Sequence, residues 1–413
     1  MPELLSPAGN REKLESAVRY GADAVYLSGK SFGMRSAADN FDFDELQAAI
    51  AYAHERDVLV YLTVNVMPRT KEYPQLRAYF ERLRTALSPD ALIISDLGVL
   101  FLAKEILPHV PIHISTQANT VSAQTCRAFH ALGASRVVLA RELTLDEIRA
   151  IRADTPDTLQ LEAFIHGSMC MAYSGRCLLS GFFTGRDANR GMCTQPCRWH
   201  YHLQNVHYEI VEEKRPELPI PILESDGETF FMSSRDTCMI EHVPALIEAG
   251  IDSFKIEGRM KSAYYAAVVT NTYRMAIDAV RSGELYDPRW MRELESVSHR
   301  PYHTGYYFDN SKEEANTTDN PGYIKENAYL AIVKGYDPAT GMATMLQRNK
   351  FSVGDTVELL TPGKLGERTE VTALYDPNGE PLLSVPHPQM PFLMPMPHPA
   401  KEGDILRASE RGD

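Results

Sequence analysis

Short runs of strand-forming residues alternate with amphipathic helical stretches along the first 165 residues of the chain. Such runs predict buried strands at residues 3–6, 24–28, 59–65, 92–95, 112–116, 136–140, 160–165 and 253–257. Strand–helix units repeated about eight times favour an α/β fold, a (β/α)8 TIM-like barrel, over an open doubly wound sheet. The turn after the first strand reads SerProAlaGlyAsn and lacks a phosphate-binding glycine fingerprint. A Rossmann domain therefore has little support.

The 413-residue chain is too long for a single core, and its pattern changes after about residue 300. Residues 1–300 are expected to form the barrel domain. At about 167–235 it is interrupted by a cysteine-bearing insertion, an antiparallel excursion at the C-terminal mouth. Polar residues in 301–327 predict a linker, and short alternating strands in 328–413 predict a small closed all-β barrel domain. There, the Pro- and Met-rich stretch 386–400 is expected to be an extended edge segment.

Charge balance and hydropathy limit the class of protein. Lys and Arg number 42 against 55 Asp and Glu, so the net charge of −13 argues against a protein that coats nucleic acid nonspecifically. A local basic patch is still compatible with this balance. The chain begins MPELLSPAGN, without a basic or apolar leader region, and no run of about 18 apolar residues occurs. A cytoplasmic protein that spans no membrane is therefore expected.

Clustered cysteines are the strongest chemical signal in the sequence. Four of them lie close together: Cys170, Cys177, Cys193 and Cys197. Thiols stay reduced in the cytoplasm, so such a cluster indicates a metal site before disulfides. Four thiolates satisfy the ligand count of either a [4Fe–4S] cluster or structural zinc. Gly- and Ser-rich loops around the thiols favour the [4Fe–4S] cluster, because backbone N–H groups can then point at the sulfurs. Cys126 and Cys238 are expected to be packing residues.

Several stretches of this sequence resemble the collagenase-like peptidase family, number thirty-two among peptidases of unknown catalytic type. They read SPAGN (6–10), GADAVYLSG (21–29), FIHGSMC…YSGRCLLSG (164–181), GRDANRGMCTQPCRW (185–199) and FKIEGRMKS (254–262). The family label implies proteolysis. The better-understood members of the family imply oxygen-independent hydroxylation instead. These members carry a [4Fe–4S] cluster on four cysteines.

Within that family, the C-terminal β-domain and the Cys193/Cys197 doublet look most like the branch that hydroxylates tRNA at C5 of the wobble uridine. This resemblance implies tRNA as the partner and a [4Fe–4S] cluster on the four cysteines. It also implies prephenate, a small acidic metabolite, as co-substrate. Other branches act on ribosomal RNA or on a quinone precursor, and these substrates are kept as alternatives.

Polar residues at or after strand ends are candidates to line the site, because functional groups gather at the carboxyl ends of barrel strands. The candidates for substrate binding are Arg35, Asn65, Gln117, Asn119, Arg141 and Lys261. The candidates for catalysis are His166, Lys255, Glu257 and Arg259. Their cations suit an acidic small molecule, and structural ion pairs at the barrel rim are the alternative for each.

The insertion has a basic and aromatic character that suits phosphates and stacked bases. This character comes from Arg186, Arg190, Arg198, Trp199 and His200. The alternative is a solvated loop with Trp199 in its own core.

Proteolysis and simple binding are the competing functions. The sequence contains no HExxH motif. A GxSxG pattern does occur at residues 29–33 (GKSFG), but the next helical pattern starts only at about residue 43, so the strand–turn–helix elbow of a serine nucleophile is not predicted. His166 could form a Cys–His nucleophile with a neighbouring thiol, although a histidine beside a metal site more often bonds to a ligand. A binding module without catalysis is the third hypothesis.

Overall fold

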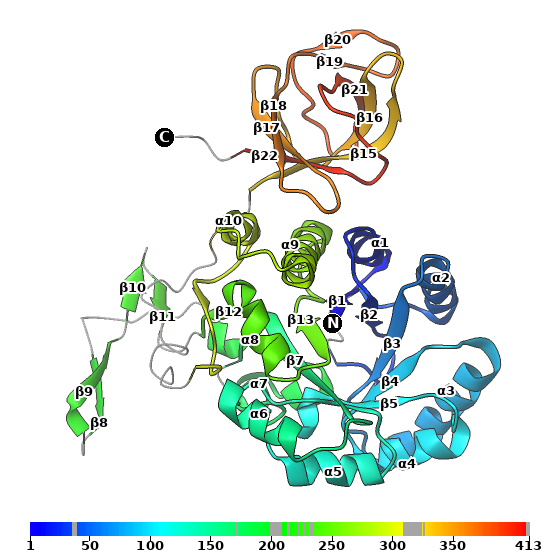
Figure 1. Ribbon diagram of the computed structural model, residues 1–413, viewed down its shortest axis with the longest axis vertical. Helices are drawn as coiled ribbons and strands as arrows, with labels where there is room; N and C mark the ends of the chain where they lie inside the picture. The colour runs from blue at the N-terminus through cyan, green and yellow to red at the C-terminus, as the bar shows by residue number, and fades with distance from the viewer. Residues whose placement is uncertain are drawn as a thin grey trace.

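Eight parallel strands form a closed barrel at the centre of the larger domain (Figure 1). The computed structural model describes residues 1–34, 39–170, 172–198, 209–212, 215–221, 223–225, 228–230, 234–308, 324 and 327–409. The barrel strands are β1 (Glu3–Pro7), β2 (Ala24–Leu27), β3 (Leu59–Val64), β4 (Ala91–Ile94), β5 (Ile112–Ile114), β6 (Arg136–Val138), β7 (Gln160–Ser168) and β13 (Ser253–Ile256). Strand β7 pairs with both β6 and β13 and so closes the ring. The predicted (β/α)8 barrel is confirmed.

Helices cover the outside of the barrel, and their apolar faces pack on the outward side chains of the strands. They are α1 (Arg11–Arg19), α2 (Phe43–His54), α3 (Tyr73–Ala86), α4 (Leu97–Ile106), α5 (Ala123–Ala131), α6 (Leu145–Ala153), α8 (Val243–Glu248), α9 (Ala263–Ser282) and α10 (Arg289–Glu295). Short 3-10 turns are η1 (Thr70–Glu72), η2 (Thr116–Ala118) and η5 (Ile240–His242). Polar side chains such as Asn10, Asp42 and Ser262 accept bonds from first-turn N–H groups and fix where these helices begin. In the part of the chain that is described, no helix is both long and apolar enough to cross a membrane.

The insertion leaves the barrel at the end of β7 and returns beside it. Its described part contains α7 (Leu179–Thr184), η3 (Ala188–Arg190), η4 (Pro196–Arg198), and the antiparallel pairs β8–β9 (Glu209–Glu212, Arg215–Pro221) and β10–β11 (Leu223–Ser225, Glu228–Phe230). Strand β12 (Asp236–Cys238) then pairs antiparallel with β7, and β14 (Tyr302–His303) pairs with β12. The excursion therefore starts and finishes at one place on the barrel wall.

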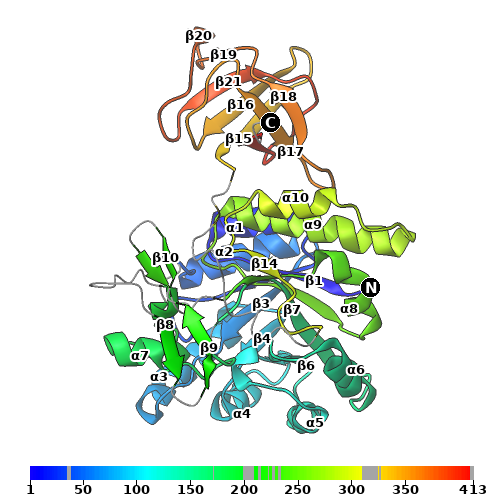
Figure 2. The same cartoon turned by 90° about the vertical axis from the view of Figure 1, so that its left-hand side faces the viewer.

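The C-terminal domain is all β, as the sequence predicts. Its strands form one antiparallel sheet in the order β18-β17-β22-β15-β16-β21-β19-β20, curled into a half-barrel (Figure 2). Their bounds are β15 (Tyr329–Asp337), β16 (Met342–Gln347), β17 (Thr356–Leu360), β18 (Glu367–Glu370), β19 (Leu374–Tyr375), β20 (Pro381–Leu382), β21 (Pro391–Pro395) and β22 (Ile405–Ala408). Buried side chains such as Val333, Met345 and Phe392 fill the concave side.

The edge-segment prediction for 386–400 is wrong, because β21 lies inside the sheet between β16 and β19. The backbone oxygen of Met390 accepts a bond from Gln347 of β16 at 3.0 Å, and the backbone N–H of Met396 donates to Gly341, just before β16, at 2.9 Å. The backbone N–H and C=O groups of the even-numbered residues in this segment therefore face β16. The nitrogens of Pro391 and Pro395 therefore point the other way, where β19 pairs with β21 at a single position. The missing N–H groups of these prolines cost no bond to β16.

The half-barrel rests on α1, α9 and α10 of the barrel domain (Figures 1 and 2). Arg407 of β22 is buried at this junction and pairs with Glu293 of α10 at 2.8 Å. The Tyr20 hydroxyl donates to the backbone oxygen of Leu360 at 2.9 Å. Leu360 and Ile405 belong to the same apolar cluster as the barrel helices. The two domains thus share part of one core.

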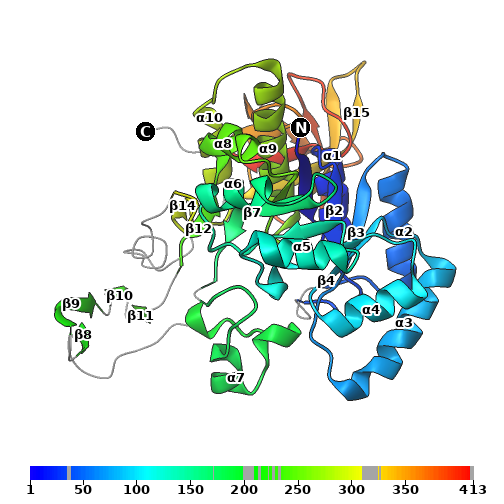
Figure 3. The same cartoon turned by 60° about the horizontal axis from the view of Figure 1, so that its bottom comes forward.

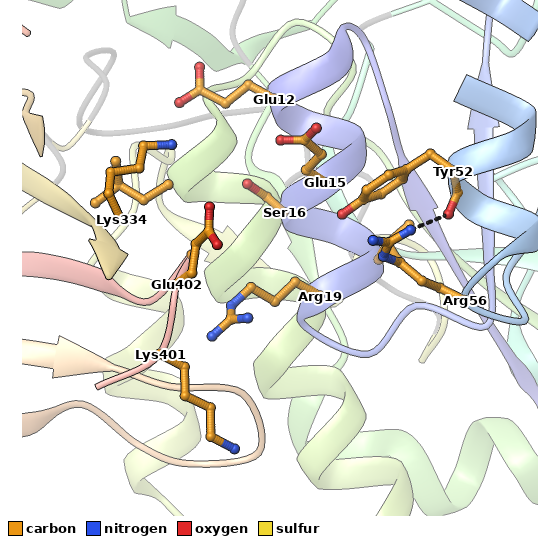
Figure 4. A pocket seen from close by; sticks show the side chains of 12 residues that line it. Glu12, Glu15, Ser16, Arg19, Tyr52, Arg56, Lys334, Lys401 and Glu402 are labelled. Atoms are coloured by element: carbon orange, nitrogen blue, oxygen red, sulfur yellow. Dashed lines mark hydrogen bonds between the residues drawn. The ribbon is translucent and has the colours of Figure 1, made fainter. Parts of the chain in front are cut away.

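A cleft beside this junction separates α1 and α2 from the C-terminal domain (Figure 4). Both signs of charge line it: Glu12, Glu15, Arg19, Arg56, Lys334, Lys401 and Glu402. Arg56 is occupied locally, since it stacks over the Tyr52 ring at 3.8 Å and donates to the Tyr52 backbone oxygen. Charges this mixed create no field of one sign, so the cleft offers no focused site for an ion.

Candidate active site

Side chains from the carboxyl ends of the strands line a cavity at the mouth of the barrel. Among them are six residues predicted from the sequence: Asn65, Gln117, Arg141, Lys255, Glu257 and Arg259. They come from η2, β13 and the segments after β3, β6 and β13. Residues far apart in the sequence thus meet where TIM barrels place their active sites. Arg35 lies outside the described residues.

Two arginines at this mouth are held in fixed positions. Arg141 donates to the backbone oxygen of Ser168 at 2.7 Å and lies 3.8 Å from the centre of the Phe164 ring. One of its nitrogens is 3.7 Å from a carboxylate oxygen of Glu257. The buried Arg259 donates to the Thr63 hydroxyl at 3.1 Å. Fixed cations in a partly buried cavity attract anionic groups without first having to reorganise.

Lys255 is buried at the base of the cavity and belongs to a chain of ions inside the barrel. Its Nζ donates to Glu162 at 2.6 Å, and Glu162 also accepts from Arg136 at 3.0 Å. The Arg136 guanidinium also forms an ion pair with the Glu3 carboxylate, at the opposite end of the barrel, at 2.6 Å. Burial alone would raise the pKa of Glu162, but Lys255 and Arg136 lower it to about 2. The carboxylate therefore stays charged and keeps the Lys255 ammonium in place.

Three predicted amide residues connect the barrel to the cysteine segment and its surroundings. Asn65 accepts a bond from the backbone after β2 at 3.0 Å. Asn119 adopts a left-handed conformation (φ 58°), and its Nδ2 donates to the backbone oxygen of Ser174 at 3.0 Å. Gly175 packs so closely on Gln117 that a Cβ there would lie 2.4 Å from the Gln117 backbone oxygen. These amides fix the loops around the mouth.

A second pocket adjoins the first, and all four predicted ligand cysteines line it. The segment that carries them lies beside the mouth with α7 (Figure 3). The two pockets share Gln117 and Arg141. The four thiols form no disulfide, and the backbone N–H of Gln195 points at the Cys193 sulfur at 3.4 Å. Such N–H···S contacts are the feature that the sequence predicts for a cluster site.

Cys126 and Cys238 lie apart from this pocket and are buried in the core. Burial raises the pKa of Cys126 to about 11 and that of Cys238 to about 12. Both thiols stay protonated at neutral pH, and a protonated thiol is a poor metal ligand. Their location agrees with the packing role expected from the sequence.

The donor set in the second pocket fits an iron–sulfur cluster. Within the described residues, no three His, Cys, Asp or Glu side chains come close enough together to hold a single metal ion. Each iron of a four-iron cluster takes its own thiolate, whereas one zinc ion gathers all its ligands around a single centre. The four thiols of the pocket match the ligand number of a [4Fe–4S] cluster and also that of structural zinc.

Two family descriptions match the chain. Peptidase family U32 covers residues 9–317, and the peptidase family U32 C-terminal domain covers residues 325–407. The chain belongs to peptidase family U32. The resemblance seen in the sequence motifs is thereby confirmed.

Three relatives of this U32 chain have informative names. It is 37% identical over 402 residues to tRNA hydroxylation protein P of Escherichia coli, covering 87% of this chain and 86% of that protein. It is 42% identical over 372 residues to a protein of Methanocaldococcus jannaschii named uncharacterized protease, with 87% of each covered. A 23S rRNA 5-hydroxycytidine synthase of E. coli is 34% identical over 367 residues, covering 84% of this chain and 53% of that protein.

Three predicted site residues of the U32 chain line neither pocket: Asn119, which bonds to Ser174, and also His166 and Lys261. His166 is buried on the outer side of the barrel wall, between the rings of Tyr265, Tyr273 and Tyr302. Burial lowers its pKa to about 3, so it is neutral at physiological pH. Lys261 donates to the backbone oxygen of Ser298 at 2.8 Å. Their location supports packing and loop-anchoring roles for His166 and Lys261.

The basic residues predicted in the insertion differ in their surroundings. Arg190 pairs with Glu72 of η1 at 2.6 Å, which ties the insertion to the barrel. Arg186 is exposed beyond the end of α7. Trp199, His200 and the side chain of Arg198 lie outside the described residues.

Sequence reasoning missed Glu162, which accepts a bond from Lys255, and Arg136, which bonds to the same carboxylate. A signal for them was present. Glu162 interrupts the apolar strand sequence QLEAFI, and a carboxylate inside a buried strand must be paired to be tolerated. The sequence alone could not say which cations lie opposite it, because they come from other strands.

Proposed function

We propose that this chain is an oxygen-independent RNA hydroxylase that acts on C5 of the wobble uridine of tRNA. The observation that carries the proposal is the pair of adjoining pockets, one lined by four thiols and the other by fixed cations. Two relatives support RNA as the substrate class, since their names describe tRNA hydroxylation and 5-hydroxycytidine in 23S rRNA. A wobble uridine is unpaired in its loop, so its C5 is accessible without opening a duplex.

Cys170, Cys177, Cys193 and Cys197 would hold a [4Fe–4S] cluster at the barrel mouth. Such a cluster supplies one-electron transfer when bound. With four cysteine ligands, each iron is already coordinated by protein, which favours electron transfer or structural support over direct binding of substrate. The Gln195 N–H directed at Cys193 would stabilise charge on that sulfur.

The cation-lined cavity would bind a small acidic co-substrate, and prephenate, which carries two carboxylates, suits it. Arg141 and Arg259 offer guanidinium groups, which pair well with carboxylates. Lys255 adds a third cation whose position Glu162 fixes. Arg141 also lines the cysteine pocket, so it would lie between the co-substrate and the RNA base.

Mass spectrometry of tRNA nucleosides tests this function. A deletion strain should lose 5-hydroxyuridine-type modification at the wobble position, and the wild-type gene should restore it. A Cys177→Ala gene should fail to do so. Purified protein should then form the modified nucleoside anaerobically from tRNA and prephenate. Unchanged wobble nucleosides in the deletion strain, together with no RNA binding by the purified protein, would end this proposal.

Proteolysis is the second candidate, since one relative is named an uncharacterized protease. The sequence lacks an HExxH motif, and its GxSxG pattern at residues 29–33 lies in the loop between β2 and α2 instead of on a tight strand-to-helix turn. His166 is enclosed by tyrosine rings. Under this function the deletion strain keeps its wobble modification, and the purified protein cleaves casein or denatured collagen.

A further inference from the structure

We infer that the rim of the cysteine pocket is a binding surface for unpaired RNA bases and their phosphates. We define this rim as Tyr173, which lines the pocket, together with the exposed side chains of the same cysteine-bearing segment, Arg176, Leu178, Arg186 and Met192. The inference rests on the proposed function and deepens it, because it names the side chains that would receive the RNA.

Large apolar side chains of the rim are exposed to solvent. Tyr173 is 47% exposed, Leu178 79% and Met192 41%, and Tyr173 also lines the cysteine pocket. All three belong to the segment that carries the cysteines. A single exposed apolar side chain is ordinary, but an exposed apolar patch rimmed by polar groups marks an interaction site, and here three such side chains gather in one short segment. A flat aromatic ring at a pocket edge suits the face of an unpaired base.

The local charge identifies the partner as a polyanion. Between residues 172 and 198 the chain has four arginines, one aspartate, and no lysine or glutamate. This excess of positive charge occurs in a protein whose net charge is −13. Arg176 and Arg186 of the rim are exposed, whereas Arg190 is engaged with Glu72. Exposed cations between exposed apolar groups are the arrangement that binds phosphates and bases of single strands together.

The pocket beneath the rim has the character that an extruded base requires. Apolar residues such as Met169, Leu179 and Pro196 line it, together with the polar residues Gln117 and Glu142. Glu142 accepts bonds from the backbone and hydroxyl of Ser174, so its position is fixed. A base that stacks on Tyr173 would thus lie at the entrance of a pocket with hydrogen-bonding groups inside.

Fluorescence anisotropy with purified, anaerobically prepared protein tests the rim. The probe is a labelled RNA stem–loop of the size of an anticodon arm, and the comparison is a blunt duplex of the same sequence. Tyr173→Ala should weaken stem–loop binding by about 5- to 150-fold, the range for loss of one stacked base. Tyr173→Phe should keep the affinity, because the ring is retained. Arg176→Ala and Arg186→Ala should each weaken binding and flatten its dependence on salt.

Matched controls lie at the far end of α9. Leu285 is 89% exposed there, and Arg281 is an exposed arginine near the opposite opening of the barrel. Leu285→Ala and Arg281→Ala should leave stem–loop affinity unchanged. Iron and sulfide content, measured for every variant, separates a rim effect from damage to the cysteine site.

Several outcomes would overturn the inference. They are unchanged affinity in Tyr173→Ala, equal binding of stem–loop and duplex, or a dimer of this chain that Tyr173→Ala dissociates. If the rim variants bind normally while wild type still modifies tRNA, the inference fails and the proposed function stands. If wild type binds the stem–loop through Tyr173 but modifies no RNA, the surface stands and the proposed function fails.

Discussion

Glu162 bonds to two buried cations in the barrel interior. Its removal leaves Lys255 without a carboxylate partner, whereas Arg136 keeps its pair with Glu3. Glu162→Gln keeps the shape of the side chain and removes the charge. The free energy of unfolding should fall by about 3 to 5 kcal/mol, as for other broken buried pairs. Urea denaturation measures this loss. Glu105→Gln, which breaks the exposed pair with Arg77, is the matched control and should change nothing measurable.

His113 makes stability depend on pH. Burial in the barrel, with a smaller effect from Arg136, lowers its pKa to about 3. Below about pH 6.5 the unfolded chain gains a proton at this position and the folded chain does not, so acid favours unfolding. Between about pH 7 and pH 5 this should cost about 2 kcal/mol.

His113→Phe keeps a ring beside Tyr61 and should remove that share of the pH dependence. Denaturation curves at the two pH values provide the measurement. Ile112→Val, on the same strand, should lower stability equally at both. An unaltered pH dependence in His113→Phe would contradict the assignment.

Each thiol of the cysteine pocket should matter for iron content, whereas the core thiols should not. Anaerobically purified wild type should be brown, with about four iron and four sulfide per chain. Alanine at any of the four pocket cysteines should greatly reduce both. Cys126→Ala and Cys238→Ala should keep them, because these thiols are buried and protonated. Stoichiometric zinc without iron in wild type would refute the [4Fe–4S] assignment.

The side of the barrel wall to which His166 points could not be predicted from its position in the sequence. Strand alternation would place it on the inside, with Glu162 and Phe164. A bulge in the β7–β13 pairing sets Lys255 opposite Phe164 and Ile256 opposite His166, which skips one residue. That skip turns His166 toward α9. A bulge of this kind depends on the partner strand and leaves no mark in the local sequence.

Among the elements, the barrel strands were predictable, including the three-residue strands β5 and β6, whereas β12 and β14 were not. Runs such as LVYLTV in β3 carry enough strand-forming residues to be recognised alone. Strands β12 and β14 have three and two residues, and pairing with neighbours defines them. The site residues also divide into those recognisable from the sequence alone and those that depend on neighbouring strands. Strand-end residues were found by position, whereas the partners of Lys255 required the assembled barrel.

Three buried side chains at or near β12 hold the start of the cysteine segment, and we call them the clamp: Ser234, Asp236 and Arg300. Ser234 donates to the backbone oxygen of Met169 at 2.7 Å, and Arg300 donates to the same oxygen at 3.2 Å. Asp236 fixes Arg300 through a buried ion pair at 2.8 Å. Met169 directly precedes Cys170, so the clamp sets where the first predicted ligand begins.

Arg300→Lys should therefore lower iron content, because lysine cannot reproduce the forked contacts of the guanidinium. Iron analysis after anaerobic purification measures the effect. Arg407→Lys is the matched control, since Arg407 is equally buried but lies at the domain junction. Equal iron loss in both variants would point to general destabilisation instead of a local effect on the cysteine segment.

At the scale of the whole molecule, the shared core couples the two domains. Arg407 pairs with Glu293 of α10 and with Glu358 of β17, both at 2.8 Å. Arg407→Ala would leave two carboxylates facing each other at the junction, which should separate one heat-unfolding transition into two. Calorimetry shows the number of transitions. Arg348→Ala removes a more exposed bridge to Glu12 and should keep a single transition. A single transition in Arg407→Ala would mean that apolar contacts alone couple the domains.

Because β7 and β12 pair antiparallel, the insertion between them could be removed or replaced without changing the barrel. Ser168 lies opposite Asp236, and Ser234 bonds to Met169, so the two ends of the excursion are already neighbours. In topology the insertion is the loop of a β-hairpin, enlarged to residues 170–233. A tight turn of a few residues would span the same gap. The cysteine-bearing insertion is thus a detachable cassette, and a barrel of this kind could lose it or accept it by one splice at a single point.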